Sequence, residues 1–330
     1  MKKTLALFFV LLALFFPVFS VFAQAEEKPI RWVDFTVTAQ ALQEAASLDI
    51  AAHEAGESLS WTELLACYAA MHGGSFAAYR PGALRSLAEK AETKRCPLSD
   101  IAQSGGSEKL YLYYCRAYDA VLSGMLGEYH AVTFENGKEV MGEKQYGVCA
   151  AAPIAKGYSV TEYNDFGTAR SYGYRRRHLG HDMLGSVGTP ICAVEGGYVE
   201  ALGWNQYGGW RIGIRSFDGK RYYYYAHLRK DAPYEDLYPG KIVNAGEVIG
   251  YLGMTGYSAK ENVNNIDIPH LHIGLELIFA PEQKDGYCQI WISLDELSRF
   301  WAQNATTAEK TPQGTHRAAS YFLRADSPQQ

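Results

Sequence analysis

The sequence lacks an excess of positive charge, because its 330 residues carry 31 Lys and Arg against 36 Asp and Glu, a formal net charge of −5. With a pI near 6.0, it offers no basic pattern of the kind that binds nucleic acid. It has no Cys-x-x-Cys pair, which excludes zinc-ribbon and thioredoxin-like motifs. No apolar run of membrane-spanning length follows the first 25 residues. The composition therefore predicts a folded protein without a nucleic-acid partner.

Residues 1–25 combine two lysines, a long apolar run and small residues, which is the plan of an export signal. The run approaches the roughly 20 residues that span a bilayer, so the segment is either a cleaved signal peptide or a retained membrane anchor. In both cases we expect the rest of the chain to lie outside the cytoplasmic membrane, extracellular or in the cell envelope. Its length predicts two domains.

Six cysteines in an exported chain allow up to three disulfides, with 15 possible connectivities. Buried free thiols that pack as small hydrophobic groups are the alternative, and it is the stronger one for Cys67 and Cys115, which fall on predicted helices. None of the six has the flanking residues of a catalytic nucleophile. The sequence leaves the two alternatives open.

Residues 30–148 show helical periodicity and predict a small helical domain. Ser60 and Glu63 form a capping box before an apolar helix, and a longer helix is predicted from residue 108 to about Met125. The three histidines of this segment have no second ligand-type residue at a useful spacing: His53, His72 and His130. The charged, glycine-containing stretch at residues 135–147 marks the predicted domain boundary. We expect no chemistry of its own from this domain.

Residues 149–302 change to short β-branched or aromatic runs separated by Gly, Pro, Asn and Asp, which predicts an antiparallel sheet. The pair Asp218-Gly219 between two such runs is a hairpin signal. Residues 303–330 are polar and predict a flexible tail. The fold class expected from the whole pattern is α+β, with a helical domain followed by an antiparallel β domain.

The candidate functional residues lie between His178 and Glu276. His270 and His272 in PHLHIGLE are two residues apart, so on a strand both imidazoles face the same side, and apolar residues occupy the other. His178 and Asp182 in HLGHD supply nitrogen and oxygen ligands that zinc accepts, and Gly180 between them permits a bend.

Each of these motifs alone is also compatible with an ordinary surface, and His227, at the end of KRYYYYAH, alone reads as a structural histidine. Together they place four histidines and one aspartate on one β-rich segment. A catalytic zinc ion uses three protein ligands, so the set provides three ligands and two further imidazoles.

The ordered combination of HxxxD, YAHL, AGEVIGYLGMTG and PHLHIGLEL resembles the lysostaphin and LytM-type zinc metallopeptidases, over roughly residues 167–277. That resemblance implies a Zn²⁺-dependent endopeptidase that hydrolyses peptide bonds in bacterial cell-wall peptidoglycan. It implies His178, Asp182 and His272 as the zinc ligands. It assigns His227 and His270 as the catalytic histidines, without deciding which is the general base.

The sequence departs from the family pattern at His181, where an apolar residue is more usual. Because adjacent strand residues point to opposite faces, we expect His181 to lie outside the ligand set. The aromatic residues near the motifs, among them Tyr207 and those at positions 222–225, either line a substrate groove or pack within the sheet. A non-hydrolytic scaffold that binds the cell wall or a partner protein is the alternative function. The presence of all five site residues favours the enzyme.

Overall fold

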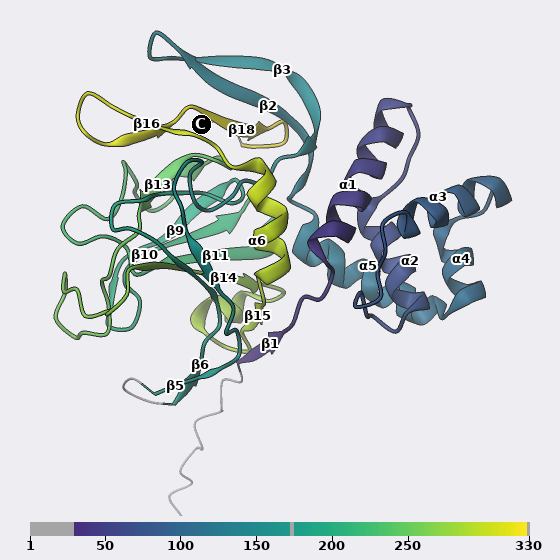
Figure 1. Ribbon diagram of the computed structural model, residues 1–330, viewed down its shortest axis with the longest axis horizontal. Helices are drawn as coiled ribbons and strands as arrows, with labels where there is room; N and C mark the ends of the chain where they lie inside the picture. Colours follow the sequence, from purple (N-terminus) through teal and green to yellow (C-terminus); the bar gives the residue numbers. More distant parts are fainter. Residues whose placement is uncertain (1–29, 172–174, 329–330) are drawn as a thin grey trace, which may run out of the picture.

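The computed structural model describes residues 30–171 and 175–328. Its first part is a bundle of helices and its second part is a mainly antiparallel sheet, which confirms the predicted α+β class (Figure 1). Among the residues described, no helix combines the length and the apolar character needed to cross a membrane. The segment predicted as signal peptide or anchor, residues 1–25, lies outside the described residues.

The helical bundle is organised around helix α2 (Trp61–Met71). Nine of the eleven residues of α2 are buried, because neighbouring helices cover it on nearly all sides. The Ser60 half of the predicted capping box forms, since Ser60 Oγ accepts a hydrogen bond from the backbone N–H of Glu63. The helices are α1 (Ala39–Glu54), α2 (Trp61–Met71), α3 (Ala83–Lys94), α4 (Leu98–Gly105) and α5 (Glu108–Leu122).

Residues 126–148 form a β-hairpin, so the prediction of helical structure up to residue 148 is wrong there. Strand β2 (Leu126–Glu135) pairs with β3 (Lys138–Val148) across a turn at Asn136 and Gly137. Both turn residues have positive φ, 50° and 77°. An Asn-Gly pair favours this two-residue hairpin turn, and it was the missed signal.

Residues 308–324 form strands, so the prediction of a flexible tail is also wrong for this stretch. Strands β16 (Ala308–Lys310) and β17 (His316–Ala318) pair with each other, and β18 (Ser320–Arg324) pairs with β2. The buried side chain of Tyr321 lies opposite Val132 in this pairing. The sequence did not predict these strands because the composition of this segment is polar. Most of their side chains are only partly buried, so no alternating apolar pattern was needed.

The main sheet has nine strands in the order β1-β15-β14-β11-β10-β9-β12, with β7 paired to β14 and β4 paired to β7. Every pairing is antiparallel except that of β1 with β15. Its strands are β1 (Arg31–Val33), β4 (Thr161–Tyr163), β7 (His181–Leu184), β9 (Gly197–Asn205), β10 (Gly209–Ser216), β11 (Arg221–Ala226), β12 (Ile242–Val243), β14 (His270–Leu277) and β15 (Ile290–Ile292). The remaining elements are β5 (Ala169–Arg170), β6 (Arg176–Arg177), β8 (Pro190–Cys192), β13 (Val248–Tyr251), α6 (Asp295–Trp301) and the 3₁₀ turns η1 (Pro281–Asp285) and η2 (Ala302–Asn304).

The two faces of this sheet differ because side chains alternate along each strand. On β11, Tyr223 and Tyr225 are fully buried in the core, whereas Tyr222 and Tyr224 face the other side and line a cavity. The same alternation on β14 buries Leu271 and turns His272 toward the cavity. Packing within the sheet is thus confirmed for Tyr223 and Tyr225, whereas Tyr222 and Tyr224 line a cavity whose role as a substrate groove stays a prediction.

A buried ion pair joins the sheet to the helical bundle. Arg221 on β11 forms a bidentate pair with Glu195, at 2.8 and 3.0 Å. The guanidinium also donates to Ala120 O at 3.1 Å and to Ser123 Oγ at 2.9 Å, at the C-terminal end of α5. A cation at that end also complements the helix dipole. Tyr223 donates to the same Glu195 carboxylate. The two bonds from Arg221 to the end of α5 therefore attach that helix to the core side of the sheet.

The six cysteines are all free thiols, which is the second of the two alternatives that the sequence left open. Cys67, Cys149 and Cys192 are buried. Burial raises the pKa of the Cys67 thiol to about 11 and that of Cys192 to about 12. These thiols stay protonated at neutral pH and pack as small apolar groups.

Candidate metal centre and cleft

Three of the predicted site residues converge on one point. His178 lies just before β7, Asp182 lies on β7, and His272 lies directly opposite Asp182 on the neighbouring strand β14. The Nε2 atom of His178 is 2.9 Å from His272 Nδ1 and 3.1 Å from Asp182 Oδ1, and the last two atoms are 2.9 Å apart. Within the described residues these three side chains form a group able to hold one metal ion.

The protonation states of this group suit a metal ligand set. Burial works to raise the pKa of Asp182, but the close contacts of its carboxylate with His178 and His272 outweigh it and hold that pKa well below its usual range. Burial lowers the pKa of His272, against the opposing effect of the Asp182 carboxylate. A carboxylate and a neutral imidazole are the forms that coordinate metals.

The donor atoms also fit zinc in number and spacing. Two ligands about 2.0–2.1 Å from a tetrahedral zinc ion lie about 3.3 Å apart, close to the three distances observed. Gly180 leaves the space that His272 occupies, since a Cβ atom there would lie 2.4 Å from His272 Cε1 and Nε2. Two imidazoles and one carboxylate are a donor set of catalytic zinc sites, in which a fourth position is open.

A carboxylate that the sequence reading missed supports His178 from behind. Oδ1 of Asp165 lies 2.6 Å from His178 Nδ1, and Arg170 donates to the other oxygen of this carboxylate. A carboxylate within ion-pair distance of Nδ1 favours a proton on that nitrogen, which leaves Nε2 to face the metal position. No motif or spacing in the sequence identifies Asp165. The only available signal is general: a histidine that binds a metal usually has a hydrogen-bond acceptor at its other ring nitrogen.

The remaining two candidate histidines lie beside this group. The ring centroids of His227 and His270 are 4.7 Å apart, and that of His227 is 5.9 Å from that of His272. His227 Nδ1 lies 2.9 Å from Thr255 O, and His270 Nδ1 lies 2.8 Å from Ile268 O. Because a carbonyl oxygen only accepts, each Nδ1 carries a proton, so in the neutral imidazole the lone pair is on Nε2.

His227 is held neutral and in an unusual backbone conformation. Burial, followed by the neighbouring His270 and His272, lowers its pKa well below the usual value. Its φ of 60° lies in the left-handed region, which non-glycine residues adopt rarely and often at functional sites. The strand β11 ends at Ala226, so this conformation turns the imidazole toward the metal group at the strand's end.

His181 lies outside the group, as its position next to Asp182 predicts. It is buried on the other side of β7, where its Nε2 is 3.8 Å from a Glu162 oxygen. Burial lowers the pKa of His181, with Glu162 opposing this effect. It therefore belongs to the packing around β7 rather than to the candidate ligands.

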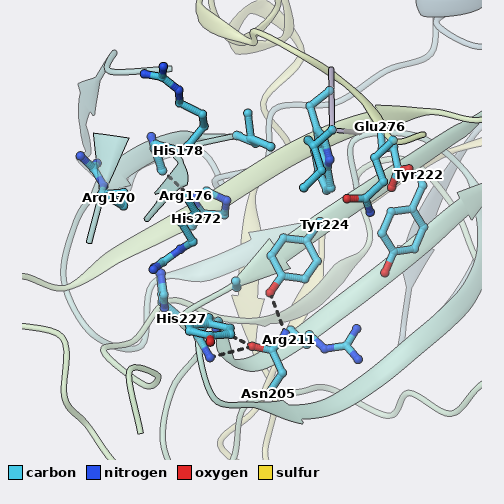
Figure 2. Close-up of a pocket in the computed structure, with 18 of the residues that line it drawn as sticks. Arg170, Arg176, His178, Asn205, Arg211, Tyr222, Tyr224, His227, His272 and Glu276 are labelled. Carbon is cyan, nitrogen blue, oxygen red and sulfur yellow. Dashed lines mark hydrogen bonds between the residues drawn. The ribbon is translucent and has the colours of Figure 1, made fainter. Parts of the chain in front are cut away.

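A cleft of about 690 Å³ runs from the metal group along the polar face of the main sheet. In Figure 2, His178, His272 and His227 lie on one side of Tyr224, and Tyr222 and Glu276 lie on the other. The cleft is lined by Trp32 on β1 and by Ile30 just before it, but by no residue of the helices α1–α5. Its volume is in the range of small-molecule and peptide sites.

Comparison with known proteins finds similarity over the part of the chain that forms the metal group and most of the cleft. Residues 176–291 match the model of Peptidase family M23. L-Ala–D-Glu endopeptidase of Bacillus subtilis (strain 168) is 36% identical over 166 residues, which cover 50% of this chain and 47% of that protein. Lysostaphin of Staphylococcus simulans is 38% identical over 96 residues, which cover 29% of this chain and 17% of that protein. This chain thus spans less than half the length of either relative.

A solved structure of LytM from Ruminococcus gnavus ATCC 29149 has a similar fold. The superposition has a TM-score of 0.50 at 21% identity and covers 82% of this chain and 88% of that one. At this level of identity the likeness concerns the fold alone. Together with the matches above, it confirms the resemblance inferred from the HxxxD and HxH motifs.

Proposed function

Because residues 176–291 of this chain belong to peptidase family M23, we propose that the protein is a zinc-dependent metalloendopeptidase acting on peptides of bacterial cell-wall peptidoglycan. The observation that carries this proposal is the convergence of His178, Asp182 and His272 on one point, with two further imidazoles beside them. Among the described residues, no residue of the helices α1–α5 or of the β2–β3 hairpin lines the cleft.

Zinc is the proposed metal, and His178 Nε2, Asp182 Oδ1 and His272 Nδ1 are its proposed ligands. A zinc ion supplies Lewis-acid polarisation of a carbonyl group and lowers the pKa of water to near neutrality. Asp165 keeps His178 in the tautomer that presents Nε2, and Gly180 leaves room for the ring of His272. The ligand set is thus held by its own neighbours before any ion binds.

His227 and His270 are the proposed catalytic histidines. Each has its Nδ1 proton committed to a backbone carbonyl, so each Nε2 is able to accept a proton from the attacking water. The resulting imidazolium is then able to donate to the oxyanion or to return the proton to the leaving amine. His227 is the more completely buried of the two, and its lowered pKa keeps it in the acceptor form.

The substrate class follows from the relatives. The Bacillus subtilis relative is named for an L-Ala–D-Glu bond. We propose that this chain cleaves a peptide bond in bacterial cell-wall peptidoglycan. An export signal or anchor at residues 1–25 would place the enzyme with that substrate outside the cytoplasmic membrane, and residues 30–148 and 149–302 would form its helical and peptidase domains.

The test is cleavage of defined peptidoglycan fragments by the purified protein without residues 1–25. Products are identified by mass spectrometry in the presence of zinc, after chelation, and after zinc is restored. We expect cleavage that chelation abolishes and zinc restores, and no cleavage by the His178→Ala variant. Intact fragments under every condition, with one bound zinc per chain, would favour the non-hydrolytic scaffold.

A further inference from the structure

The end of the cleft away from the metal group contains polar side chains whose atoms have no partner. Four of them are buried nitrogen or oxygen atoms without a hydrogen bond among the described residues: Arg211 Nε, Arg215 Nη1, Glu276 Oε1 and Trp291 Nε1. All four residues line the cleft. Burying a polar atom without a partner is costly, so a cluster of such atoms indicates a missing ligand.

Strand pairing brings these residues together on one face of the sheet. Tyr222 lies opposite Arg215 on one side and opposite Glu276 on the other, and Trp291 lies opposite Glu276. The Arg215 guanidinium stacks over the Tyr222 ring at 4.9 Å from its centroid. In Figure 2, Arg211, Tyr222 and Glu276 lie across Tyr224 from His178.

Two of the charged side chains at this end, Arg211 and Glu276, have no ion-pair partner among the described residues, whereas Arg215 is paired. Arg215 is bound in a bidentate pair by Glu200, at 2.8 and 2.9 Å. Among the described residues, Arg211 has no carboxylate within 4.0 Å of its guanidinium nitrogens, and Glu276 has no cationic nitrogen within 4.0 Å. Glu276 is only 3% exposed and Arg215 only 6%, so these side chains belong to the wall of the cleft and not to an open surface.

We propose that this end of the cleft is a subsite for a substrate side chain that ends in an α-amino acid group, with an ammonium and a carboxylate on one carbon. The guanidiniums of Arg211 and Arg215 and the Trp291 N–H are donors for the carboxylate. The Glu276 carboxylate accepts from the ammonium. A ligand with only one of the two charges would leave either Arg211 or Glu276 without a partner.

The distance suits a residue near the scissile bond. His272 and Glu276 lie on the same face of β14, four residues apart, which is about 13 Å at about 3.4 Å per residue. A diamino dicarboxylic acid residue, next but one to the cleaved carbonyl, reaches about this far with its free end. This inference rests on the proposed function for its substrate, a peptidoglycan stem peptide.

The experiment uses three synthetic stem peptides that differ only in the third residue. Meso-diaminopimelate has both terminal charges, L-lysine lacks the remote carboxylate, and 2-aminopimelate lacks the remote ammonium. We expect kcat/KM for the diaminopimelate peptide to exceed that for either analogue by at least about tenfold, since a charge-assisted contact is lost in each. Equal values for all three peptides would overturn the subsite while leaving the peptidase in place. Equal kcat/KM values for the diaminopimelate and 2-aminopimelate peptides would mean that the subsite binds only a carboxylate, which would overturn the proposal.

Two variants test which residues produce the preference for the diaminopimelate peptide. We expect Arg211→Gln to remove the preference for the diaminopimelate peptide over the lysine peptide. We expect Glu276→Gln to remove the preference for the diaminopimelate peptide over the 2-aminopimelate peptide. Arg211→Lys should restore part of the first preference. Thermal melting and zinc content identify any variant that fails to fold. If both variants keep the wild-type ratios, the assignment is wrong.

Binding to the uncleaving His178→Ala variant separates this inference from the proposed function. Calorimetry with the same peptides should show the tightest binding for the diaminopimelate peptide. Preferential binding without any cleavage by the wild-type protein would support the subsite and contradict the peptidase. Binding of the three peptides with equal affinity would contradict the subsite.

Discussion

The two ring nitrogens of His178 face two different carboxylates, Asp165 Oδ1 at 2.6 Å from Nδ1 and Asp182 Oδ1 at 3.1 Å from Nε2. The first contact fixes the tautomer and the second brings Nε2 to the metal position. Arg170 holds the first carboxylate in place. One histidine is therefore oriented by residues on both sides of its ring.

Replacing Asp165 with Asn should weaken zinc binding by about 10–100-fold, which is the usual effect of losing such a supporting group. The amide can present an N–H to His178 and so favours the wrong tautomer. Competition with a chromogenic chelator measures the affinity. Asp236→Asn is a matched control because its side chain is 95% exposed. Equal affinities for the Asp165 variant and the control would show that this contact has no role in metal binding.

His181→Ala should keep one zinc ion per chain, whereas His178→Ala should lose it. His181 points to the opposite side of β7 from Asp182 and lies 3.8 Å from Glu162, away from the three convergent atoms. Metal analysis of the two purified variants decides between them. Zinc loss in the His181 variant, with a normal melting curve, would require a different ligand set.

Strand alternation predicts from the sequence that His270 and His272 share a face, whereas the ligand set of His178, Asp182 and His272 came from the resemblance to the lysostaphin and LytM-type peptidases. In the structure, the pairing of β14 with β7 places Asp182 opposite His272. Asp165 could not be predicted, since the contact depends on how the segment before β7 folds back on His178. The strands that the sequence did not predict have two causes. Strand β18 lies in a polar segment and pairs with a strand far away in the sequence, as Tyr321 does with Val132. The β2–β3 hairpin is local, and its Asn136-Gly137 turn was the overlooked signal.

Substituting either candidate catalytic histidine should reduce kcat by about 10²–10⁴-fold without removing zinc. His227→Ala and His270→Ala each remove an Nε2 acceptor but none of the three ligand atoms. Rates are measured on a defined stem peptide, with zinc content determined on the same samples. His130→Ala is the control, because His130 bonds to Gly142 O on the distant hairpin. A kcat within threefold of wild type for both variants would remove them from the mechanism.

Arg221→Met should lower the free energy of unfolding by about 3–5 kcal/mol, the usual cost of leaving a buried charge without its partner. Arg221 and Glu195 have side chains only 1% and 4% exposed, and Tyr223 depends on the same carboxylate. Lys220→Met is the control, since its pair with Asp119 is 45% and 52% exposed and should contribute less than about 0.5 kcal/mol. Urea unfolding of both variants measures the difference. Similar midpoints would show that the helices do not depend on this ion pair.

Glu276→Gln should stabilise the protein at alkaline pH and have little effect in acid. Burial, partly offset by Arg215, raises the pKa of Glu276 from 4.5 to about 7 in the folded chain. Between these values the native state keeps a proton that the unfolded chain has released, so stability falls as pH rises through this window and levels off above it. The neutral amide removes that loss, by about 2 kcal/mol at pH 8, less than the full linkage value because the cleft admits water.

Thermal or urea unfolding at pH 5 and pH 8 measures this effect, with Glu309→Gln as a control on a carboxylate that is 54% exposed. The control should follow the wild type at both pH values, and only the Glu276 variant should gain stability at pH 8. A gain of the same size at pH 5 would mean that the amide packs better for reasons unrelated to ionisation. No gain at either pH would mean that the Glu276 carboxyl group ionises at little cost in free energy. Water would then hydrate this carboxylate, and its lack of a protein partner would no longer indicate a missing ligand.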